Sequence, residues 1–564
     1  MPDPTYVLGI GLSHDGAACL LKDGQIHVAI EKERISRIKH DGGNDSLAVH
    51  YCLDAAGIGI DDLSLVVQSA NFEKNGIQKH RYKGPRLFPA STAVPFVTIS
   101  HHLAHAWSAA GTSPFDECNV MVIDGCGSFY QQCDDLGNAF VPADVNSIPG
   151  LYGEKDSFYF FDGKNMKPLF KDFSIINYTH KPGQVYLPTS NHSIGGLYSM
   201  AAHYCFGDFD AAGKLMGLAP YGNRQQYKEE LFLLKEGRVL VNDEVMHRFF
   251  TEPADPVTHP FADHFQYYAD IAAWVQAETE RAVLYIIQHR LALHPHEQLV
   301  YAGGVALNAV TNAKIIDQTN RELYIEPAAG DNGLAIGCAY YGWIEVLKKE
   351  KVKHSGSTCF GKIYDAGVIK ETIGKTGSRE DRRAERSPDA VKTAAALLAA
   401  GKTIGFFQLG CEFGPRALGR RSILADPRTP GIREHINRHI KLREDFRPFA
   451  PAVLYEDKDI YFKKGYESPY MILIDEIKEE WKDKMPGIVH VDGTCRVQTV
   501  KDKAEPFYQL LTEFKEITGI SVLLNTSFNR MSQPIVETPE EAILFFYESR
   551  LDALVINDFI FTKQ

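Results

Sequence analysis

The sequence predicts an α/β protein with an internally duplicated N-terminal lobe and a second α/β domain. The opening segment YVLGIGLSHDGAACLLKDGQIHVAIEKER predicts three strands, with a hairpin at Asp23-Gly24. Similar strand and Asp-Gly patterns recur in NVMVIDGCGSFYQQ and around Asp162-Gly163. The charged run VLKKEKVKHSGSTC, residues 346–359, predicts a linker and a boundary near residue 353. We therefore expect domains at 1–352 and 353–564.

A duplicated lobe of this kind is typical of actin-like and sugar-kinase-like proteins, which bind a nucleotide between their two halves. Because Asp-Gly hairpins are common, a chance similarity is the alternative.

Composition restricts the class of protein. A chain of 564 residues with 44% apolar and 23% charged residues is typical of a globular protein. Its formal charge of -12 argues against nonspecific binding to nucleic acid or to an anionic membrane. The ten dispersed cysteines form no CxxC pair, and no leader or membrane-length apolar run is present. We expect a cytoplasmic protein with reduced thiols.

Two strand-to-helix turns follow a long helix predicted over Asp270–His294. In LVYAGGVALN, Gly303 and Gly304 end a buried strand, and Asn308 begins the next helix. Small residues at such a turn let backbone N–H groups approach a phosphate, although most such turns bind nothing. The loop AAGDNG after the following strand carries Asp331.

The segment HHLAHA is a candidate metal site. His101 and His105 are four residues apart and share one face of a helix, whereas His102 points away. Asp124 and Asp331 both follow strands, where α/β lobes display functional carboxylates. Two imidazoles and two carboxylates suit Fe²⁺, Mn²⁺ or Zn²⁺. The alternative is that the histidines begin a helix and bind no ion.

Two further side chains of this lobe are candidates for chemistry. His14 in SHDGA could act as a general base, because imidazole titrates near neutral pH, or it could be a hydrogen-bonded turn residue. Lys214 in GKLMGLA could approach a phosphate or an adenylate, or it could be solvated.

The C-terminal part gathers cations at loop positions near glycine, proline and aromatic residues. They are Arg416, Lys441, Arg447 and Arg496. Cations that converge on one pocket would bind phosphates during phosphoryl or adenylyl transfer, and isolated ones would be surface residues. The segment NTSFN adds the neutral groups Asn525, Ser527 and Asn529.

Ten motifs in order resemble the O-carbamoyltransferase family of NodU, CmcH and TobZ over essentially the whole chain. They are VLGIGLSHDGAACLLKDG, EKERISRIKH, HHLAHAWSA, VIDGCG, GKLMGLA, AGGVALN, GDNG, GPRALGRRS, FRPFAP and LNTSFN.

This resemblance implies an N-terminal TsaD-like lobe of the actin-like class and a C-terminal YrdC-like domain. It implies that carbamoyl phosphate and ATP, with Mg²⁺, form carbamoyl adenylate in the C-terminal domain. The carbamoyl group then passes to a hydroxyl of a small natural product in the N-terminal lobe. A membrane or nucleic-acid partner is not expected, and a homodimer is left open.

The resemblance also implies roles for particular residues. His101, His105, Asp124 and Asp331 would hold the metal, with iron as the first expectation. His14 lies at the transfer site, with Lys39 near it. The nucleotide residues of the N-terminal lobe would be Gly303, Gly304 and Asn308, and Lys214 is a further binding candidate. The adenylation site would comprise Arg416, Lys441, Arg447, Arg496, Asn525 and Ser527, with Arg447 acting in catalysis.

The acceptor is not identified by these motifs, because SNHSIGGLYS at 190–199 and the segment 155–184 differ from the tobramycin-type members. A tRNA threonylcarbamoyl transferase and a non-catalytic nucleotide-binding scaffold are the alternatives. Net negative charge disfavours the first, and the joint metal and arginine motifs disfavour the second.

Overall fold

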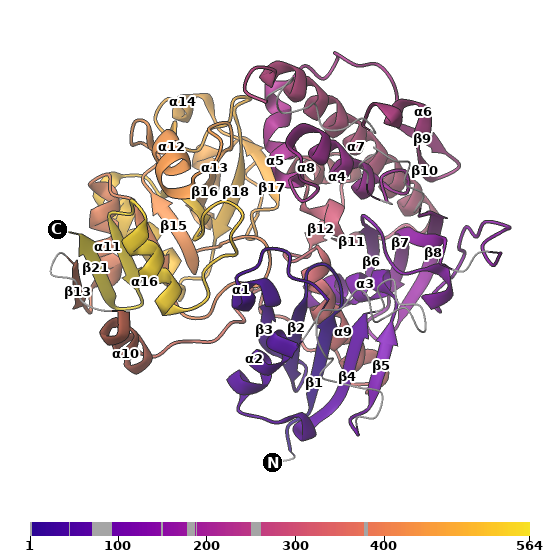
Figure 1. Ribbon diagram of the computed structural model, residues 1–564, viewed down its shortest axis with the longest axis horizontal. Coiled ribbons are helices and arrows are strands. Elements are labelled where there is room, and N and C mark those ends of the chain that lie inside the picture. Colours follow the sequence, from indigo (N-terminus) through magenta and orange to yellow (C-terminus); the bar gives the residue numbers. More distant parts are fainter. Residues whose placement is uncertain are drawn as a thin grey trace. The chain divides into compact units, whose positions relative to one another are not determined.

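The computed structural model describes residues 3–43, 46–69, 93–147, 150–176, 187, 189–249, 261–376 and 382–563 (Figure 1). The chain forms two compact units. The first comprises Met1–Lys32 and His40–Ser357, and the second comprises Glu33–Lys39 and Thr358–Gln564. A short segment from early in the sequence thus belongs to the second unit, so a single cut near residue 353 does not describe this division.

The first unit contains two five-stranded sheets of the same topology, with orders β3-β2-β1-β4-β5 and β12-β11-β6-β7-β8. In each sheet, the first three strands in sequence pair antiparallel with one another. The fourth strand pairs parallel with the first, and the fifth pairs parallel with the fourth. The predicted duplication is therefore observed. The strands are β1 (Tyr6–Gly11), β2 (Ala17–Lys22), β3 (Gln25–Glu31), β4 (Leu63–Ser69), β5 (Phe96–Ile99), β6 (Cys118–Ile123), β7 (Tyr152–Phe161), β8 (Met166–Ile175), β11 (Gln298–Ala302) and β12 (Glu322–Ile325).

The turns between these strands follow from their sequence. Asp23 and Gly24 both have positive φ, 50° and 83°, which is the conformation that joins β2 to β3 in a tight hairpin. Gly163, with φ of 90°, supports the turn between β7 and β8. The Asp-Gly dipeptides thus predicted both hairpins correctly.

Helices of the first unit pack closely against its sheets, and glycine permits the closest contacts. A Cβ atom on Gly9 of β1 would lie 2.0 Å from the Ala335 carbonyl oxygen, and one on Gly337 would lie 1.7 Å from that of Ala104. Helix α9 is therefore held tightly against β1 and against α3. The remaining elements are α1 (Lys32–Ser36), α2 (Ser46–Ala56), α3 (His101–Thr112), α4 (Ile194–Phe206), α5 (Ala212–Leu218), β9 (Phe232–Lys235), β10 (Arg238–Val241), α6 (Asp243–Met246), α7 (Phe265–Leu293), α8 (Ala309–Thr319) and α9 (Leu334–Tyr340).

The second unit is a mixed α/β domain built on a nine-stranded sheet of order β13-β21-β20-β14-β15-β19-β16-β18-β17. Its likeness to YrdC stays a prediction. Its strands are β13 (Arg382–Arg386), β14 (Ile404–Phe407), β15 (Arg421–Ala425), β16 (Ala450–Leu454), β17 (Leu473–Glu476), β18 (Thr494–Val500), β19 (Val522–Ser527), β20 (Ala553–Ile556) and β21 (Phe559–Lys563). Its helices are α10 (Ala366–Thr376), α11 (Ala390–Ala399), α12 (Ile432–His435), α13 (Lys458–Tyr461), α14 (Glu479–Lys482), α15 (Pro506–Thr518) and α16 (Pro539–Glu548).

All ten cysteines are free thiols, as their dispersed positions predicted. Among the described residues, no helix has both the length and the apolar character needed to cross a membrane.

Candidate metal centre and cation cluster

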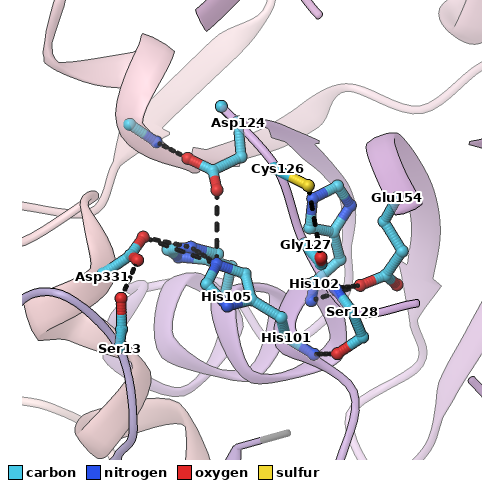
Figure 2. Close-up of polar contacts among 12 residues, drawn as sticks. Ser13, His101, His102, His105, Asp124, Cys126, Gly127, Ser128, Glu154 and Asp331 are labelled. Atoms are coloured by element: carbon cyan, nitrogen blue, oxygen red, sulfur yellow. Dashed lines mark hydrogen bonds and ion pairs between the residues drawn. The ribbon is translucent and has the colours of Figure 1, made fainter. Parts of the chain in front are cut away.

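The two histidines predicted to bind a metal lie side by side on α3. The helix begins at His101 because the Ser100 side chain caps it by accepting the Leu103 N–H. One turn apart, the Nε2 atoms of His101 and His105 come within 3.1 Å of each other (Figure 2). Both rings are fully buried. Two ring nitrogens in such close contact face the same point in space.

The two predicted carboxylates complete this cluster. Asp124 follows β6, and its Oδ2 lies 3.3 Å from His101 Nε2. Asp331 follows β12, and its Oδ1 lies 3.4 Å from His101 Nε2 and 3.6 Å from His105 Nε2 (Figure 2). All four donor atoms lie within 4.8 Å of one another. The structure thus brings together four residues that are separated by up to 230 positions in the sequence.

The charges in this cluster stabilise one another. Burial opposes a positive charge on His101, but Asp331 and Asp124 outweigh burial and raise its pKa to about 10. Burial likewise opposes ionisation of Asp331 and Asp124, but the facing imidazoles hold both pKa values below the usual range. The donor set of two nitrogens and two carboxylate oxygens fits a divalent transition ion.

The glycine pair at 303–304 holds one of these carboxylates. The Gly304 N–H donates to Asp124 Oδ1 over 2.7 Å. Gly303 has φ of 92°, and a Cβ there would lie 2.2 Å from the Ile123 carbonyl oxygen, so no other residue fits. Asn308 caps α8 by accepting the Thr311 N–H, and it also pairs with Gln276. The predicted nucleotide contacts of these residues stay predictions.

His14 lies beside the same cluster. Its Nδ1 is 3.1 Å from Asp331 Oδ2, and the ring is 60% exposed. Local desolvation opposes protonation, but Asp15 and Asp331 raise the pKa of His14 well above its ordinary value. Ser13 hydrogen-bonds the same Asp331 oxygen, and His40 Nδ1 lies 2.8 Å from Asp15. Sequence reasoning missed Ser13, Asp15 and His40, although two of them flank His14 in the same turn.

Two predicted lysines are engaged by other groups. Lys39 belongs to the second unit and forms an ion pair with Glu33 at 2.8 Å. Lys214 lies on α5, with its ammonium 4.1 Å from the centre of the Phe206 ring. Cation–π contact therefore orients Lys214.

The second unit contains a cluster of cations that includes all four predicted ones. Burial, followed by the charge of Arg447, lowers the pKa of Arg416 to about 10. Burial and three arginine neighbours, at 416, 443 and 447, lower that of Arg496 well below its ordinary value. Burial, Arg443 and Arg447 also lower the pKa of Lys441 well below its ordinary value. We name these five residues the cation cluster: Arg416, Lys441, Arg443, Arg447 and Arg496.

Arg443 is the member that sequence reasoning missed. It lies within KLREDFRP, two residues after Lys441, and its Nε donates to Asn437 Oδ1 over 2.7 Å. The mixed charges of this segment were also compatible with a surface loop. Only the fold shows that Arg443 is buried beside the other cations.

Neutral groups of β19 and of the turn after it border the cation cluster. Lys441 Nζ donates to the Ser527 carbonyl oxygen over 2.6 Å and to Ser527 Oγ over 3.1 Å. It also donates to Asn529 Oδ1 over 2.6 Å. Asn525 is buried and donates to Gln498 Oε1 and to the Ala417 carbonyl oxygen. These amides and hydroxyls fix the lysine at the end of its π-helix, Ile436–Lys441.

Comparison with protein families now identifies the class. The chain matches the family described as Carbamoyltransferase N-terminus over residues 6–87 and 60–340, and Carbamoyltransferase C-terminus over residues 395–563. It therefore belongs to the carbamoyltransferase family and is a carbamoyltransferase enzyme.

Among its relatives, an uncharacterized protein of Synechocystis sp. is 31% identical, with 99% of this chain and 97% of that protein covered. Nodulation protein NolNO of Sinorhizobium fredii is 31% identical, with 98% of this chain and 79% of that protein covered. Nodulation protein U of the same species is 26% identical, with 93% of each covered. Full-length HypF in its phosphate- and nucleotide-bound form aligns at a TM-score of 0.35 and 14% identity over 61% of this chain and 56% of that chain, too low a similarity to carry an argument.

Proposed function

We propose that the protein is an ATP-dependent O-carbamoyltransferase that works in two half-reactions. In the first, carbamoyl phosphate and water give carbamate and phosphate. A carbamate oxygen then attacks the α-phosphorus of ATP, so that pyrophosphate leaves and carbamoyl adenylate forms. In the second, an acceptor hydroxyl attacks the carbamoyl carbon, and AMP leaves with the bridging oxygen. The acceptor is a small hydroxyl compound.

The cation cluster supports the first half-reaction. Arginine and lysine side chains that converge on one point bind phosphates and stabilise the charge that develops on a departing pyrophosphate. Arg447 is close enough to the others to lower the pKa values of Arg416, Lys441 and Arg496. Asn525 and Ser527 would add neutral hydrogen bonds to the nucleotide, and Mg²⁺ would accompany ATP.

The His101, His105, Asp124 and Asp331 cluster carries the proposal for the second half-reaction, because its donor set is compact, buried and built from both sheets. These four residues would hold a divalent transition ion, with iron as the first candidate. When bound, such an ion neutralises charge on phosphate oxygens and so improves AMP as a leaving group.

His14 is proposed to take the proton of the acceptor hydroxyl. It is exposed, and the carboxylates of Asp15 and Asp331 stabilise its protonated form. The neutral ring is therefore a stronger base, and it is available for this step only above its raised pKa. Lys39 and Lys214 stay candidates for binding the carbamoyl or nucleotide groups.

The test separates the half-reactions. Anaerobic, iron-loaded protein with ATP and carbamoyl phosphate is expected to release pyrophosphate, and a panel of hydroxyl acceptors is expected to raise turnover and give a carbamoylated product. An absence of pyrophosphate with every acceptor would contradict the proposal. Retardation of tRNA at physiological salt would favour the tRNA-modifying alternative instead.

A further inference from the structure

The first turn of α3 is held by three side chains from outside the helix. The initial N–H groups of a helix have no acceptor within it and need one elsewhere. The His101 N–H donates to Ser128 Oγ over 2.9 Å, and the His102 N–H points to Glu154 Oε2 at 3.3 Å (Figure 2). The Leu103 N–H donates to Ser100 Oγ over 3.4 Å. These three bonds set where the helix, and therefore its metal-binding face, begins.

All three caps are connected to one buried lysine on β8. Lys171 and Glu154 are fully buried, and the Lys171 ammonium pairs with Glu154 Oε1. The same ammonium lies 2.7 Å from Asp135 Oδ2, while Asp135 Oδ1 accepts the Ser100 hydroxyl over 2.9 Å. The third cap, Ser128, donates its backbone N–H to Glu154 Oε2 over 2.8 Å.

The charges of this network balance around the start of the helix. Two carboxylates, Glu154 and Asp135, face one ammonium, and the partial positive charge at the N-terminus of α3 offsets the remaining negative charge. Burial opposes the charge on Lys171, but Glu154 and the groups around it raise its pKa well above the ordinary value. Lysine stays protonated here and links the two carboxylates.

This network is not itself a second metal site. Cys133, Asp135 and Glu154 bring three donor atoms within 4.8 Å of one another. The Lys171 ammonium already pairs with both carboxylates, so a cation is present between them. Gly127 shows how little room remains, since a Cβ there would lie 2.5 Å from Glu154 Oε2 and 2.6 Å from His102 Cδ2.

We propose that Lys171 is a positioning residue for the metal centre, acting through Glu154 and Asp135 on the start of α3. The inference rests on the proposed metal-binding role of His101 and His105. Without the ammonium, two buried carboxylates would repel each other, and the caps they support would move. Metal–ligand distances tolerate only about 0.2 Å, so a small shift of α3 would misplace both ring nitrogens.

The experiment measures the affinity of the full-length protein for Co²⁺ alone, by titration against a chromophoric chelator. Lys171→Met is compared with the wild type and with a matched control, Arg290→Met. Arg290 is an equally buried cation of the same unit, paired with the buried Asp156 at 2.9 Å. In the described part of the chain, neither Arg290 nor Asp156 hydrogen-bonds an atom of α3. Thermal unfolding of each variant reports the loss of stability.

Lys171→Met is expected to weaken Co²⁺ binding about 10- to 100-fold, the range seen when an outer partner of a metal ligand is removed. Arg290→Met is expected to lower the melting temperature about as much as Lys171→Met does. Its Co²⁺ affinity should stay within about two-fold of the wild type. Equal affinity of Lys171→Met and the wild type, or equal weakening by both variants, would overturn the proposal.

A milder variant covers the case in which Lys171→Met does not fold. Ser128→Ala removes only the oxygen that caps the His101 N–H, and it is expected to weaken Co²⁺ binding several-fold. Unchanged affinity would again overturn the positioning role. His101→Ala separates this failure from that of the centre itself: if it binds Co²⁺ as the wild type does, the proposed metal site is wrong as well.

Discussion

The two candidate sites differ in how their charged groups interact. In the first unit, two imidazoles face two carboxylates around one point, so the unlike charges stabilise each other. The pKa of His101 rises and those of the two carboxyls fall. In the second unit, five cations lie together, and burial lowers the pKa of every one of them. Repulsion by neighbouring cations lowers the pKa values of Arg416, Lys441, Arg443 and Arg496 further.

This difference has a consequence for ligand binding. In the histidine and carboxylate cluster, contacts of Asp124 and Asp331 with His101 already hold the four donor atoms within 4.8 Å of one another, so the geometry is formed before a small cation binds. Binding of that cation would displace the proton of His101. The cation cluster gains most of its stabilisation when a polyanion arrives, because bound phosphates relieve the repulsion among the arginines. Variants that affect one site and leave the other unchanged test whether the two act separately.

The largest effect is expected from His101→Ala. Loss of one ring nitrogen leaves three donors, so bound metal should fall to background and carbamoyl transfer should drop about 10³-fold. Pyrophosphate release in the absence of acceptor should persist, because the cation cluster is untouched. Metal analysis and the two assays are run beside His102→Gln, whose side chain faces Ser157 and whose metal content should stay normal. Equal metal in His101→Ala and the wild type would contradict the site.

Arg496→Met is expected to act on the other half-reaction, with a smaller effect. Removing one of five converging cations should lower pyrophosphate release about 10²-fold, while metal content stays at the wild-type level. Arg386→Gln is the control, since Arg386 is exposed and pairs with Asp558. Loss of metal from Arg496→Met would show that the two sites are not independent.

The four residues of the candidate metal site could be proposed because each stands in a local pattern and the family resemblance links them. Histidines four apart on a helix share a face, and the two aspartates follow buried strands whose ends meet at one edge. The repeated Asp-Gly hairpins likewise predicted the duplicated sheets. These features depend on short segments, so the sequence carries them directly.

The partners of Lys171, Arg34 and Arg37 were not predictable. Lys171 follows its partner Asp135 by 36 residues, and nothing in the alternation of β8 indicates that its ammonium is buried. The segment Glu33–Lys39 belongs to the second unit because Arg34 donates to the Gly414 carbonyl oxygen, 380 residues away, and Arg37 to that of Ile535. Such pairings have no periodic signature, and they exist only once the fold is complete.

Gly303→Ala tests how strictly the first site depends on its backbone. A methyl group would collide with the Ile123 carbonyl oxygen and force alanine to positive φ, which should cost at least about 2 kcal/mol of stability. Bound metal should fall too, because Gly304 would no longer hold Asp124. Gly213→Ala, where a Cβ meets nothing within 4 Å, should leave the melting temperature unchanged or raise it. Similar melting temperatures for both variants would refute this account.

A pH-dependent effect is expected for Glu326, another buried carboxyl of the first unit. Asp124 and Asp331 face imidazoles, whereas burial of Glu326, only partly offset by the Ala328 N–H, raises its pKa to about 8. Between its ordinary value of 4.5 and pH 8 the folded protein keeps this proton and the unfolded chain loses it. Stability should therefore fall as pH rises through that window, by at most about 1.4 kcal/mol per pH unit.

Glu326→Gln keeps the shape of the side chain and removes its titration. As pH rises from 5 to 8, the free energy of unfolding of the wild type should therefore fall steadily relative to that of this variant. Urea denaturation of both proteins measures the difference. Above about pH 8 the difference should change no further, because both states of the wild type are then ionised. A difference independent of pH across this range would mean that Glu326 is ionised when folded, and that an unpaired carboxylate is tolerated in the same core that pairs Asp124 and Asp331 with histidines.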